Sequence, residues 1–368
     1  MTQSSPPQPS PSGPEDPWTV RRLLDWIRKY LGEKDVDSPR VCAELLLGHV
    51  LGCERLRLYM TPEAEPTPQQ LADLRALVAR AAEHEPVQYL VGSWPFHGRE
   101  FEVGPCTLIP RPATELLVDR ALDEIRSKGI HRDWKLLDLC TGSGCIGVSL
   151  LATLNAARKG PISERHQSAD PARQSIEAEV LVAEEVELDL ELQPVPTTGA
   201  SASIDSDGSS PEQVQPEPGA LDLIATDIVP EALELAGRNA ARHGVSEFLQ
   251  LRSGSLWDPL EQGERGAFDI ICSNPPYVSD SEYDALDRNV REFEPQQALR
   301  GGRDGLDLVR RILQDAPDWL QPGGLLLVEV GAHTAEQALQ EAHALARFES
   351  LDLQNDHEGF PRMLVLRT

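Results

Sequence analysis

The residues from Trp134 to the C-terminus alternate between short apolar runs and stretches with helical spacing, and this alternation constrains the fold more than any other feature. The apolar runs are typical of buried strands. They lie at Leu136–Leu139, Leu221–Ala225, Phe268–Cys272, Leu325–Val328, Phe348–Leu353 and Met363–Leu366. The helical stretches between them lie at Ile146–Leu154, Pro230–His243, Leu306–Trp319 and Thr334–Arg347. Strands that alternate with helices predict an α/β fold, with a mostly parallel sheet and helices on both faces.

Changes in composition divide the chain into further regions. Residues 1–16 are rich in Pro, Ser and Gln, which predicts a disordered tail. Residues 17–86 have helical periodicity without strand-like alternation, so we expect a small helical domain there, followed by a connecting segment at 87–107. The α/β unit then spans 108–368 and is interrupted at about residues 158–218 by a stretch rich in Pro, Ser, Gln and Glu. We interpret this stretch as a disordered insertion, because lengthening a loop costs only about 0.6 kcal/mol per doubling.

Two positions match the sequence pattern of a helix N-terminal capping box, in which a hydroxyl and a Gln or Glu three residues later satisfy each other's backbone N–H groups. Thr67 and Gln70 fit the pattern, with Pro68 at the favoured first helical position. Thr334 and Gln337 fit it near the C-terminus. We therefore expect helices to begin at both places.

The charge of the chain excludes several classes of partner. Its 368 residues carry a net charge of −26, of which the stretch 161–220, with 13 acidic and 2 basic residues, contributes −11. The remaining −15 speaks against a protein that holds nucleic acid through phosphates, or one that binds an anionic membrane surface. No apolar run approaches the roughly 18 residues of a membrane-spanning helix, and the N-terminus does not resemble a signal peptide.

The six cysteines are scattered, without a CxxC pair or a histidine cluster at ligand spacing. This is typical of reduced thiols in a cytoplasmic protein and predicts no structural metal site.

A glycine-rich loop between a predicted strand and a predicted helix forms a candidate cofactor site. It consists of Cys140, Thr141, Gly142, Ser143 and Gly144. Glycines allow a ligand to approach the backbone, and the helix N-terminus offers free N–H groups. Such a loop could bind a dinucleotide or a nucleoside. A tight turn without a ligand would also use glycines. The next strand ends at Asp227, whose carboxylate can accept both ribose hydroxyls of an adenosyl group or, alternatively, cap the following helix.

The tetrapeptide Asn274-Pro275-Pro276-Tyr277 follows another predicted strand, where an open α/β sheet places its active site. The prolines remove N–H donors, so the loop presents acceptors. The Asn274 side-chain oxygen and the Pro275 carbonyl can each accept one hydrogen of an NH₂ group, and Tyr277 can stack on the plane that bears it. Holding both hydrogens directs the nitrogen lone pair at an electrophilic methyl group. We therefore predict Asn274, Pro275 and Tyr277 as catalytic residues and all four residues as substrate-binding.

These motifs and several others resemble the release-factor glutamine methyltransferases, the PrmC/HemK family, over nearly the whole length outside the tail. The other matching segments are Pro86–Gly92, Thr107–Glu115, Phe293–Pro295, Ala298–Leu299, Gly301–Leu306 and Glu329–Gly331. The resemblance implies a class I S-adenosylmethionine-dependent methyltransferase, with a doubly wound, mostly parallel seven-stranded sheet and a small N-terminal all-helical domain that recognises the substrate. It further implies transfer of a methyl group to the side-chain amide nitrogen of the glutamine in the Gly-Gly-Gln motif of peptide-chain release factors, by a monomer.

The resemblance also implies roles for single residues. The loop from Cys140 to Gly144 would contact the methionine part of S-adenosylmethionine, Asp227 the ribose and Leu256 the adenine, with Asn274 beside the reacting methyl group. Arg111, Thr114 and Glu115 would surround this site. Cys140 stands where the family usually has glycine, so its backbone must either avoid a positive φ or carry strain.

Three other functions remain to be weighed. An amino-methyltransferase acting on adenine or guanine of nucleic acid would use the same NH₂ clamp, but it would need basic residues to hold a flipped base. A binding module without activity would have no need for the complete set of motifs. An NAD-dependent oxidoreductase would need a hydride-handling His or Lys constellation, which the sequence does not offer.

Overall fold

A computed structural model describes residues 17–159 and 219–368 of the chain. The predicted disordered tail at 1–16 and almost all of the predicted insertion at 158–218 lie outside the described residues. In the described part, no helix is both long and apolar enough to cross a lipid bilayer.

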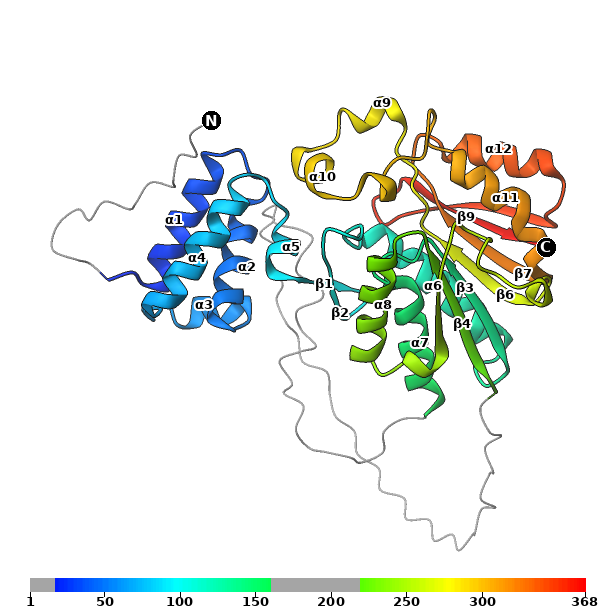
Figure 1. Ribbon diagram of the computed structural model, residues 1–368, viewed down its shortest axis with the longest axis horizontal. Helices are drawn as coiled ribbons and strands as arrows, with labels where there is room; N and C mark the ends of the chain where they lie inside the picture. The colour runs from blue at the N-terminus through cyan, green and yellow to red at the C-terminus, as the bar shows by residue number, and fades with distance from the viewer. Residues whose placement is uncertain (1–16, 160–218) are drawn as a thin grey trace, which may run out of the picture.

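The N-terminal helices form a small bundle, seen at the left of Figure 1. They are α1 (Val20–Gly32), α2 (Pro39–Leu51), α3 (Arg55–Met60), α4 (Pro68–Ala81) and α5 (Val87–Val91). A common apolar core joins them, in which Ile27, Leu31, Leu46 and Leu47 are fully buried. The predicted helix over Pro39–Leu51 is confirmed, and the predicted capping box of Thr67 and Gln70 is formed at the start of α4.

A short antiparallel hairpin of β1 (Ser93–Phe96) and β2 (Arg99–Glu102) follows the bundle. The hairpin buries Phe96 and Phe101 against the α/β unit. Asn239 of α8 (Pro230–Arg242) ties the hairpin to this unit, because its side chain accepts a hydrogen bond from the Glu102 N–H at 2.7 Å and donates to the Glu102 carbonyl at 3.0 Å.

The α/β unit is built on a seven-stranded sheet with the strand order β5-β4-β3-β6-β7-β9-β8. Its strands are β3 (Trp134–Leu139), β4 (Leu221–Asp227), β5 (Leu249–Ser253), β6 (Phe268–Ser273), β7 (Leu320–Glu329), β8 (Ser350–Asn355) and β9 (Pro361–Arg367). Strands β5, β4, β3, β6 and β7 run parallel, and β9 is antiparallel to both of its neighbours. The predicted seven-stranded, mostly parallel sheet is confirmed.

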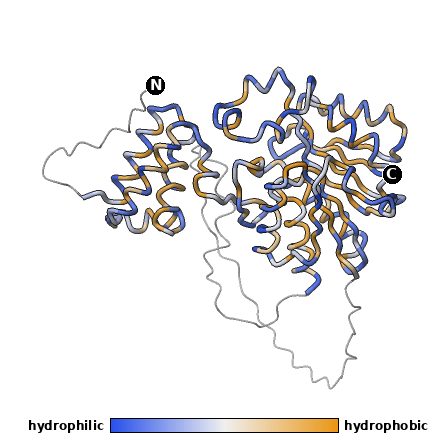
Figure 2. Tube along the Cα trace, viewed as in Figure 1, coloured by the Kyte–Doolittle hydropathy of each residue, from blue (hydrophilic) through white to orange (hydrophobic). Residues whose placement is uncertain are grey.

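Helices cover both faces of this sheet (Figures 1 and 2), so that its central strands are apolar on both sides. One face packs against α6 (Glu115–Lys128) and α7 (Cys145–Arg158), and the other against α11 (Asp307–Trp319) and α12 (Ala335–Leu345). The register places Leu137 of β3 between Ile224 of β4 and Ile271 of β6. Two short helices, α9 (Asp280–Tyr283) and α10 (Arg288–Phe293), follow the loop after β6.

One predicted element start is wrong in detail. Thr334 precedes α12, but its side chain makes no capping bond, and its hydroxyl instead donates to the Gly331 carbonyl at 3.1 Å. The physical reason is the backbone of Thr334, with φ −103° and ψ −6°. A capping hydroxyl reaches the third helical N–H from an extended backbone, which Thr67 has and Thr334 does not.

Candidate active site

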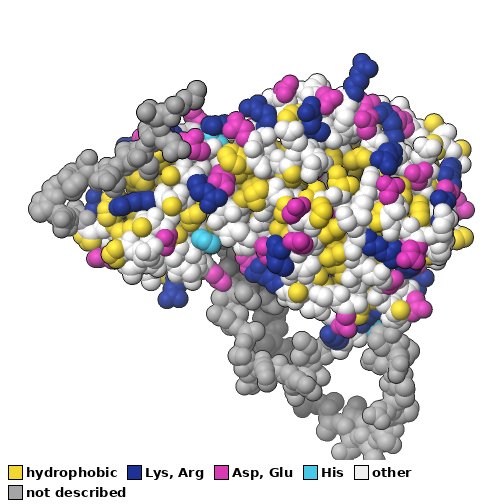
Figure 3. Space-filling view, in the orientation of Figure 1, with side chains coloured by type: hydrophobic (Ala, Val, Ile, Leu, Met, Phe, Trp, Pro, Cys, Tyr) yellow, Lys and Arg dark blue, Asp and Glu magenta, His cyan; other side chains and the backbone are white. Residues whose placement is uncertain are grey.

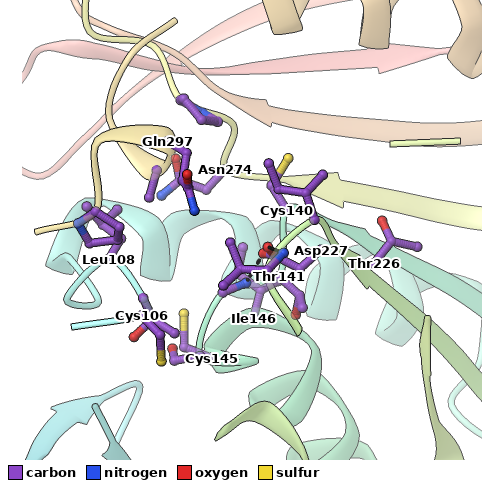
Figure 4. Close-up of a pocket in the computed structure, with 18 of the residues that line it drawn as sticks. Cys106, Leu108, Cys140, Thr141, Cys145, Ile146, Thr226, Asp227, Asn274 and Gln297 are labelled. Carbon is purple, nitrogen blue, oxygen red and sulfur yellow. Dashed lines mark hydrogen bonds between the residues drawn. The ribbon is translucent and has the colours of Figure 1, made fainter. Parts of the chain in front are cut away.

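The loops after β3, β4 and β6 meet at the carboxyl edge of the sheet and line one cavity, shown in Figure 4. Three parallel neighbouring strands end there side by side, so residues more than a hundred positions apart come together. The loop after β3 supplies Thr141 and Gly142, the end of β4 supplies Asp227, and the loop after β6 supplies Asn274. The structure thus brings the predicted ribose-binding acid together with Cys140 to Ser143 of the predicted cofactor loop and with Asn274 and Pro276 of the predicted NH₂ clamp. Gly144, Pro275 and Tyr277 are not among the residues that line this cavity.

Close packing shapes the glycine-rich loop. Gly142 and Gly144 have φ values of +54° and +78°, which glycine adopts without strain. A Cβ on Gly144 would lie 3.1 Å from the Ala236 Cβ, so this loop packs tightly on α8. Asn239, which holds the β1–β2 hairpin, also donates to the Ser143 carbonyl at 2.9 Å. Contacts with α8 therefore fix the conformation of this loop without a ligand.

Asp138, at the base of this loop, is fully buried and accepts hydrogen bonds from the Thr141 hydroxyl at 2.6 Å and the Gly147 N–H at 3.1 Å. Both bonds go to Oδ2, while Oδ1 is buried and meets no donor in the described structure. Burial raises the pKa of Asp138 to about 7. Asp138 therefore organises the loop from inside the protein, a role that the sequence analysis did not assign to it.

Two residues without the freedom of glycine have left-handed backbones beside the cavity. Cys140 has a φ of +60° and Leu256 a φ of +49°. Of the two alternatives expected for Cys140, the structure has the strained one. Such backbones cost on the order of 1 kcal/mol each and are found where surrounding contacts impose them, often at functional sites.

Asp227 lines the cavity, and its two carboxylate oxygens are oriented by the backbone. Oδ2 accepts the Gly142 N–H and Oδ1 accepts the Val229 N–H, each at 2.9 Å. Burial raises the pKa of Asp227, and these hydrogen bonds oppose that effect. A carboxylate has about four lone-pair sites, so Asp227 can accept a hydroxyl hydrogen in addition to these backbone bonds. The bond to Val229, the residue before α8, shows that Asp227 also satisfies the start of that helix.

The Asn274 side chain is oriented by a hydrogen bond that leaves its acceptor free. Its Nδ2 donates to the Thr114 hydroxyl at 3.0 Å, whereas its Oδ1 is buried and has no donor among the residues described. Tyr277 is nearly buried, and its hydroxyl donates to Glu329 Oε1 at 3.0 Å. Burial, followed by the negative charge of Glu329, raises the pKa of this phenol.

The glycine-containing segment after α10 supports the clamp loop from behind. A Cβ on Gly301 would lie 2.7 Å from the Pro276 carbonyl oxygen, and one on Gly305 only 2.3 Å from the Tyr277 carbonyl oxygen. The backbone of Val278 meanwhile exchanges hydrogen bonds with Leu299 and Gly301. The glycines allow two backbone segments to lie in contact, which explains why glycines recur in the sequence here.

The residues expected around the site fall into two groups. Arg111 and Thr114 line the cavity, and Arg111 forms an ion pair with buried Glu294 at 2.5 Å. Glu115 does not line it, because its carboxylate accepts the His97 N–H at the turn of the β1–β2 hairpin. The described cavity also includes Gln297, which Figure 4 places near Asn274 and which the sequence analysis did not identify.

The sheet has a single antiparallel strand, next to its edge. A glycine-rich loop and an acid lie at the ends of its first two parallel strands. Together these features define a class I S-adenosylmethionine-dependent methyltransferase. A family model described as the PrmC N-terminal domain matches residues 22–92. A release factor glutamine methyltransferase of Geobacter sulfurreducens is 37% identical over 322 residues, 88% of this chain and 87% of the relative. The protein of the same name from Rhodopirellula baltica is 32% identical over 96% of this chain and 97% of its own. The chain belongs to the release factor glutamine methyltransferase family.

Proposed function

We propose that the protein transfers a methyl group from S-adenosylmethionine to the side-chain amide nitrogen of the glutamine in the Gly-Gly-Gln motif of peptide-chain release factors. The observation that carries this proposal is the buried Oδ1 of Asn274, a residue of the cavity lining, because no described donor satisfies this acceptor. A buried acceptor without a partner costs about 1–3 kcal/mol, which a donor brought by the substrate recovers. A primary amide brings two such N–H donors.

The residues at the cavity fit the cofactor. Asp227 is a hydrogen-bond acceptor in the cavity lining that can accept the ribose hydroxyls, and Leu256 lines the same cavity where adenine is expected. The glycine-rich loop from Cys140 to Gly144 leads to the cavity from the N-terminus of α7, where the amino acid part would bind. S-adenosylmethionine supplies an electrophilic methyl group on a sulfonium centre.

The clamp residues act on the amide by position and polarity. An amide nitrogen is a weak nucleophile because its lone pair is delocalised into the carbonyl group. Asn274 Oδ1 and the Pro275 carbonyl would each accept one N–H, so the nitrogen lone pair is turned toward the methyl group. The same acceptors stabilise positive charge that develops on nitrogen during transfer. The new N–C bond replaces the C–S bond, and one N–H proton leaves to solvent.

We further propose that the partner is a release factor protein in the cytoplasm, and that one chain suffices, since the complete proposed site lies on one chain. The amino groups of adenine or guanine offer the same two hydrogens, so the alternative substrate must be tested directly. The net charge of −15 outside residues 161–220 supports the protein substrate.

The test uses radiolabelled S-adenosylmethionine with three substrates: a release factor, the same factor with its Gly-Gly-Gln glutamine replaced by alanine, and duplex DNA. We expect label only in the unmodified release factor. Label in DNA alone, or equal label in both factors, would refute the proposed substrate.

A variant tests the clamp. Asn274→Ala is expected to lower kcat about 100-fold, the scale found for removal of one electrostatic contact in a transition state. Calorimetry should show cofactor binding largely retained. Asn355→Ala, at an exposed asparagine on β8, serves as the control and should behave like the unmodified protein. Unchanged turnover in Asn274→Ala would contradict the mechanism.

A further inference from the structure

A chain of three hydrogen bonds lies behind the clamp and connects three segments far apart in sequence. Asn274 Nδ2 lies 3.0 Å from Thr114 Oγ1, which precedes α6. Thr114 Oγ1 lies 2.6 Å from Oε2 of Glu329, at the end of β7, and the Tyr277 hydroxyl lies 3.0 Å from Oε1 of the same carboxylate. Glu329 is fully buried. Both side chains of the clamp that carry polar groups, Asn274 and Tyr277, are thus anchored on one buried acid.

The direction of this chain follows from the chemistry of its members. A carboxylate only accepts hydrogen bonds, so the Thr114 hydroxyl must donate its single hydrogen to Glu329. Having no second hydrogen, Thr114 can only accept from Asn274. The amide group of Asn274 must therefore turn its NH₂ toward Thr114 and its oxygen away from Thr114. The outcome is an unpartnered Oδ1 on a residue that lines the cavity.

We propose that Glu329, acting through Thr114, is a positioning residue that determines which end of the Asn274 amide faces the substrate, and thereby selects a carboxamide over a carboxylate of the same shape. This inference rests on the proposed function. Asn274 Oδ1 attracts the N–H of glutamine and repels the oxygen of glutamate. With the amide reversed, Nδ2 would face the cavity and the preference would reverse.

The surroundings of Glu329 support its acceptor role. Burial raises its pKa, but the hydrogen bonds from Thr114 and Tyr277 and the charges of Arg111 and Arg362 favour the ionised form. An ionised acid that is buried requires such partners, since an unpaired buried charge is strongly destabilising. Arg111 pairs with Glu294 and Arg362 with Asp356, so the oxygens of Glu329 remain available to the two hydroxyl groups.

The test measures how strongly the enzyme distinguishes glutamine from glutamate. Two forms of a release factor, with Gly-Gly-Gln or Gly-Gly-Glu, are titrated into the full chain in the presence of S-adenosylhomocysteine. The dissociation constant of the Gly-Gly-Glu form divided by that of the Gly-Gly-Gln form reports the orientation of the Asn274 amide, and a high ratio means a preference for glutamine. A general loss of structure would weaken both complexes and leave this ratio unchanged.

Three variants separate the contributions. Thr114→Val keeps the shape of the side chain and removes the relay, so the ratio should fall at least tenfold. Thr114→Ser should restore it relative to the valine variant. Glu329→Gln should also lower the ratio, because a carboxamide can offer Thr114 either an oxygen or an N–H. Thr153→Val is the matched control, since the buried Thr153 hydroxyl on α7 has no partner among the described residues.

The outcomes distinguish this inference from the proposed function. Suppose that the unmodified enzyme methylates the release factor and that both variants keep an unchanged cooperative thermal transition. If Thr114→Val and Glu329→Gln then also keep the glutamine preference of the unmodified enzyme, the positioning role is refuted. If the unmodified enzyme does not methylate the release factor at all, the proposed function itself fails. A lowered ratio in both variants with restoration by Thr114→Ser supports the inference.

Discussion

At the scale of single residues, the left-handed backbone of Cys140 carries a measurable cost. A non-glycine residue in this region loses on the order of 1 kcal/mol relative to glycine. We predict that Cys140→Gly is more stable than Cys140→Ala by about 1 kcal/mol, although both remove the same thiol. The free energy of unfolding, from urea titrations of both variants, gives the difference.

The control for this prediction is Cys272, which is buried within β6 and has no positive φ. There alanine should be the more stable of the two substitutions by about 0.5–1 kcal/mol, since glycine loses more conformational freedom on folding. The same order of stability at both positions would show that Cys140 is not strained.

Asp138 gives the protein a pH-dependent stability. Its pKa is about 7 when folded and 3.8 in the reference state. A group whose pKa is raised on folding contributes stability below pH 4, and this contribution is lost as the pH rises toward 7. Asp138→Asn keeps an oxygen for the Thr141 and Gly147 donors and does not titrate. We therefore predict that the variant gains about 2 kcal/mol over the unmodified protein between pH 5 and 7.

Urea titrations at half-unit pH steps would measure this gain, with Asp352→Asn, at an exposed position on β8, as the control for the change in net charge. A stability difference that does not vary with pH would contradict the raised pKa of Asp138.

The site residues that could be predicted from the sequence are those that lie in recognisable local motifs. The loop of Cys140 to Gly144, Asp227 and the clamp at Asn274 each follow a recognisable strand, so their meeting at one edge was predictable. The link between Thr114 and Glu329 was not, because 215 positions separate them and either residue is ordinary in its own segment. Only the sheet register brings the end of β7 under the loop before α6.

At the scale of elements, the capping box at α4 illustrates how much a helix start contributes. The Gln70 N–H donates to the Thr67 hydroxyl at 3.3 Å, and the Thr67 N–H to the Gln70 side chain at 2.9 Å. We predict that Thr67→Ala costs about 1 kcal/mol locally. Hydrogen exchange of the α4 amides in the full chain should accelerate about fivefold.

Ser38 provides the comparison, since it precedes α2 and its side chain caps nothing. Ser38→Ala should leave the exchange of the α2 amides nearly unchanged. Equal acceleration in the two variants would mean that the Thr67 bonds are not what protects the helix.

Several of the elements that the residue pattern missed are short or partly exposed, but α6, with 14 residues and a buried apolar face, was missed as well. Helix α3 has six residues, of which only Leu58 is buried, so no apolar stripe marks it. Strand β5 lies at the sheet edge and has only half-buried and exposed residues. The long runs of β3, β4 and β6 were evident because both faces of these strands are covered. The capping pattern at Thr334 misled for another reason, since its hydroxyl serves the Gly331 loop instead of the helix.

At the scale of the whole molecule, charged side chains are spread over the face that Figure 3 shows. On the face shown in Figure 3, basic and acidic side chains are interspersed, and no continuous basic stripe crosses it. A protein that holds a nucleic acid backbone would gather its basic residues along one path. The charge distribution on this face is thus consistent with a protein substrate. We expect the affinity of the enzyme for this substrate to depend only weakly on salt concentration.

Arg158 and Gly219, on either side of residues 160–218, lie next to each other in the α/β unit. The guanidinium group of Arg158, at the end of α7, donates to the carbonyl oxygens of Ile130, Arg132 and Gly219 at 2.7–2.8 Å. The Gly219 N–H also donates to the His131 carbonyl at 2.7 Å. The chain therefore leaves and re-enters the fold at one place, and the described sheet is complete without the residues between.

We predict that replacing residues 160–218 with a Gly/Ser linker of about eight residues raises the free energy of unfolding by about 2 kcal/mol and leaves turnover unchanged. A linker of this length spans at most about 28 Å, which suffices for ends that are in contact. The gain follows from loop closure, since the loop is halved about three times at roughly 0.6 kcal/mol each. A control with a Gly/Ser linker of the original length separates length from composition and should match the unmodified protein. Loss of the cooperative transition in both would show that the native segment contributes to the folded structure.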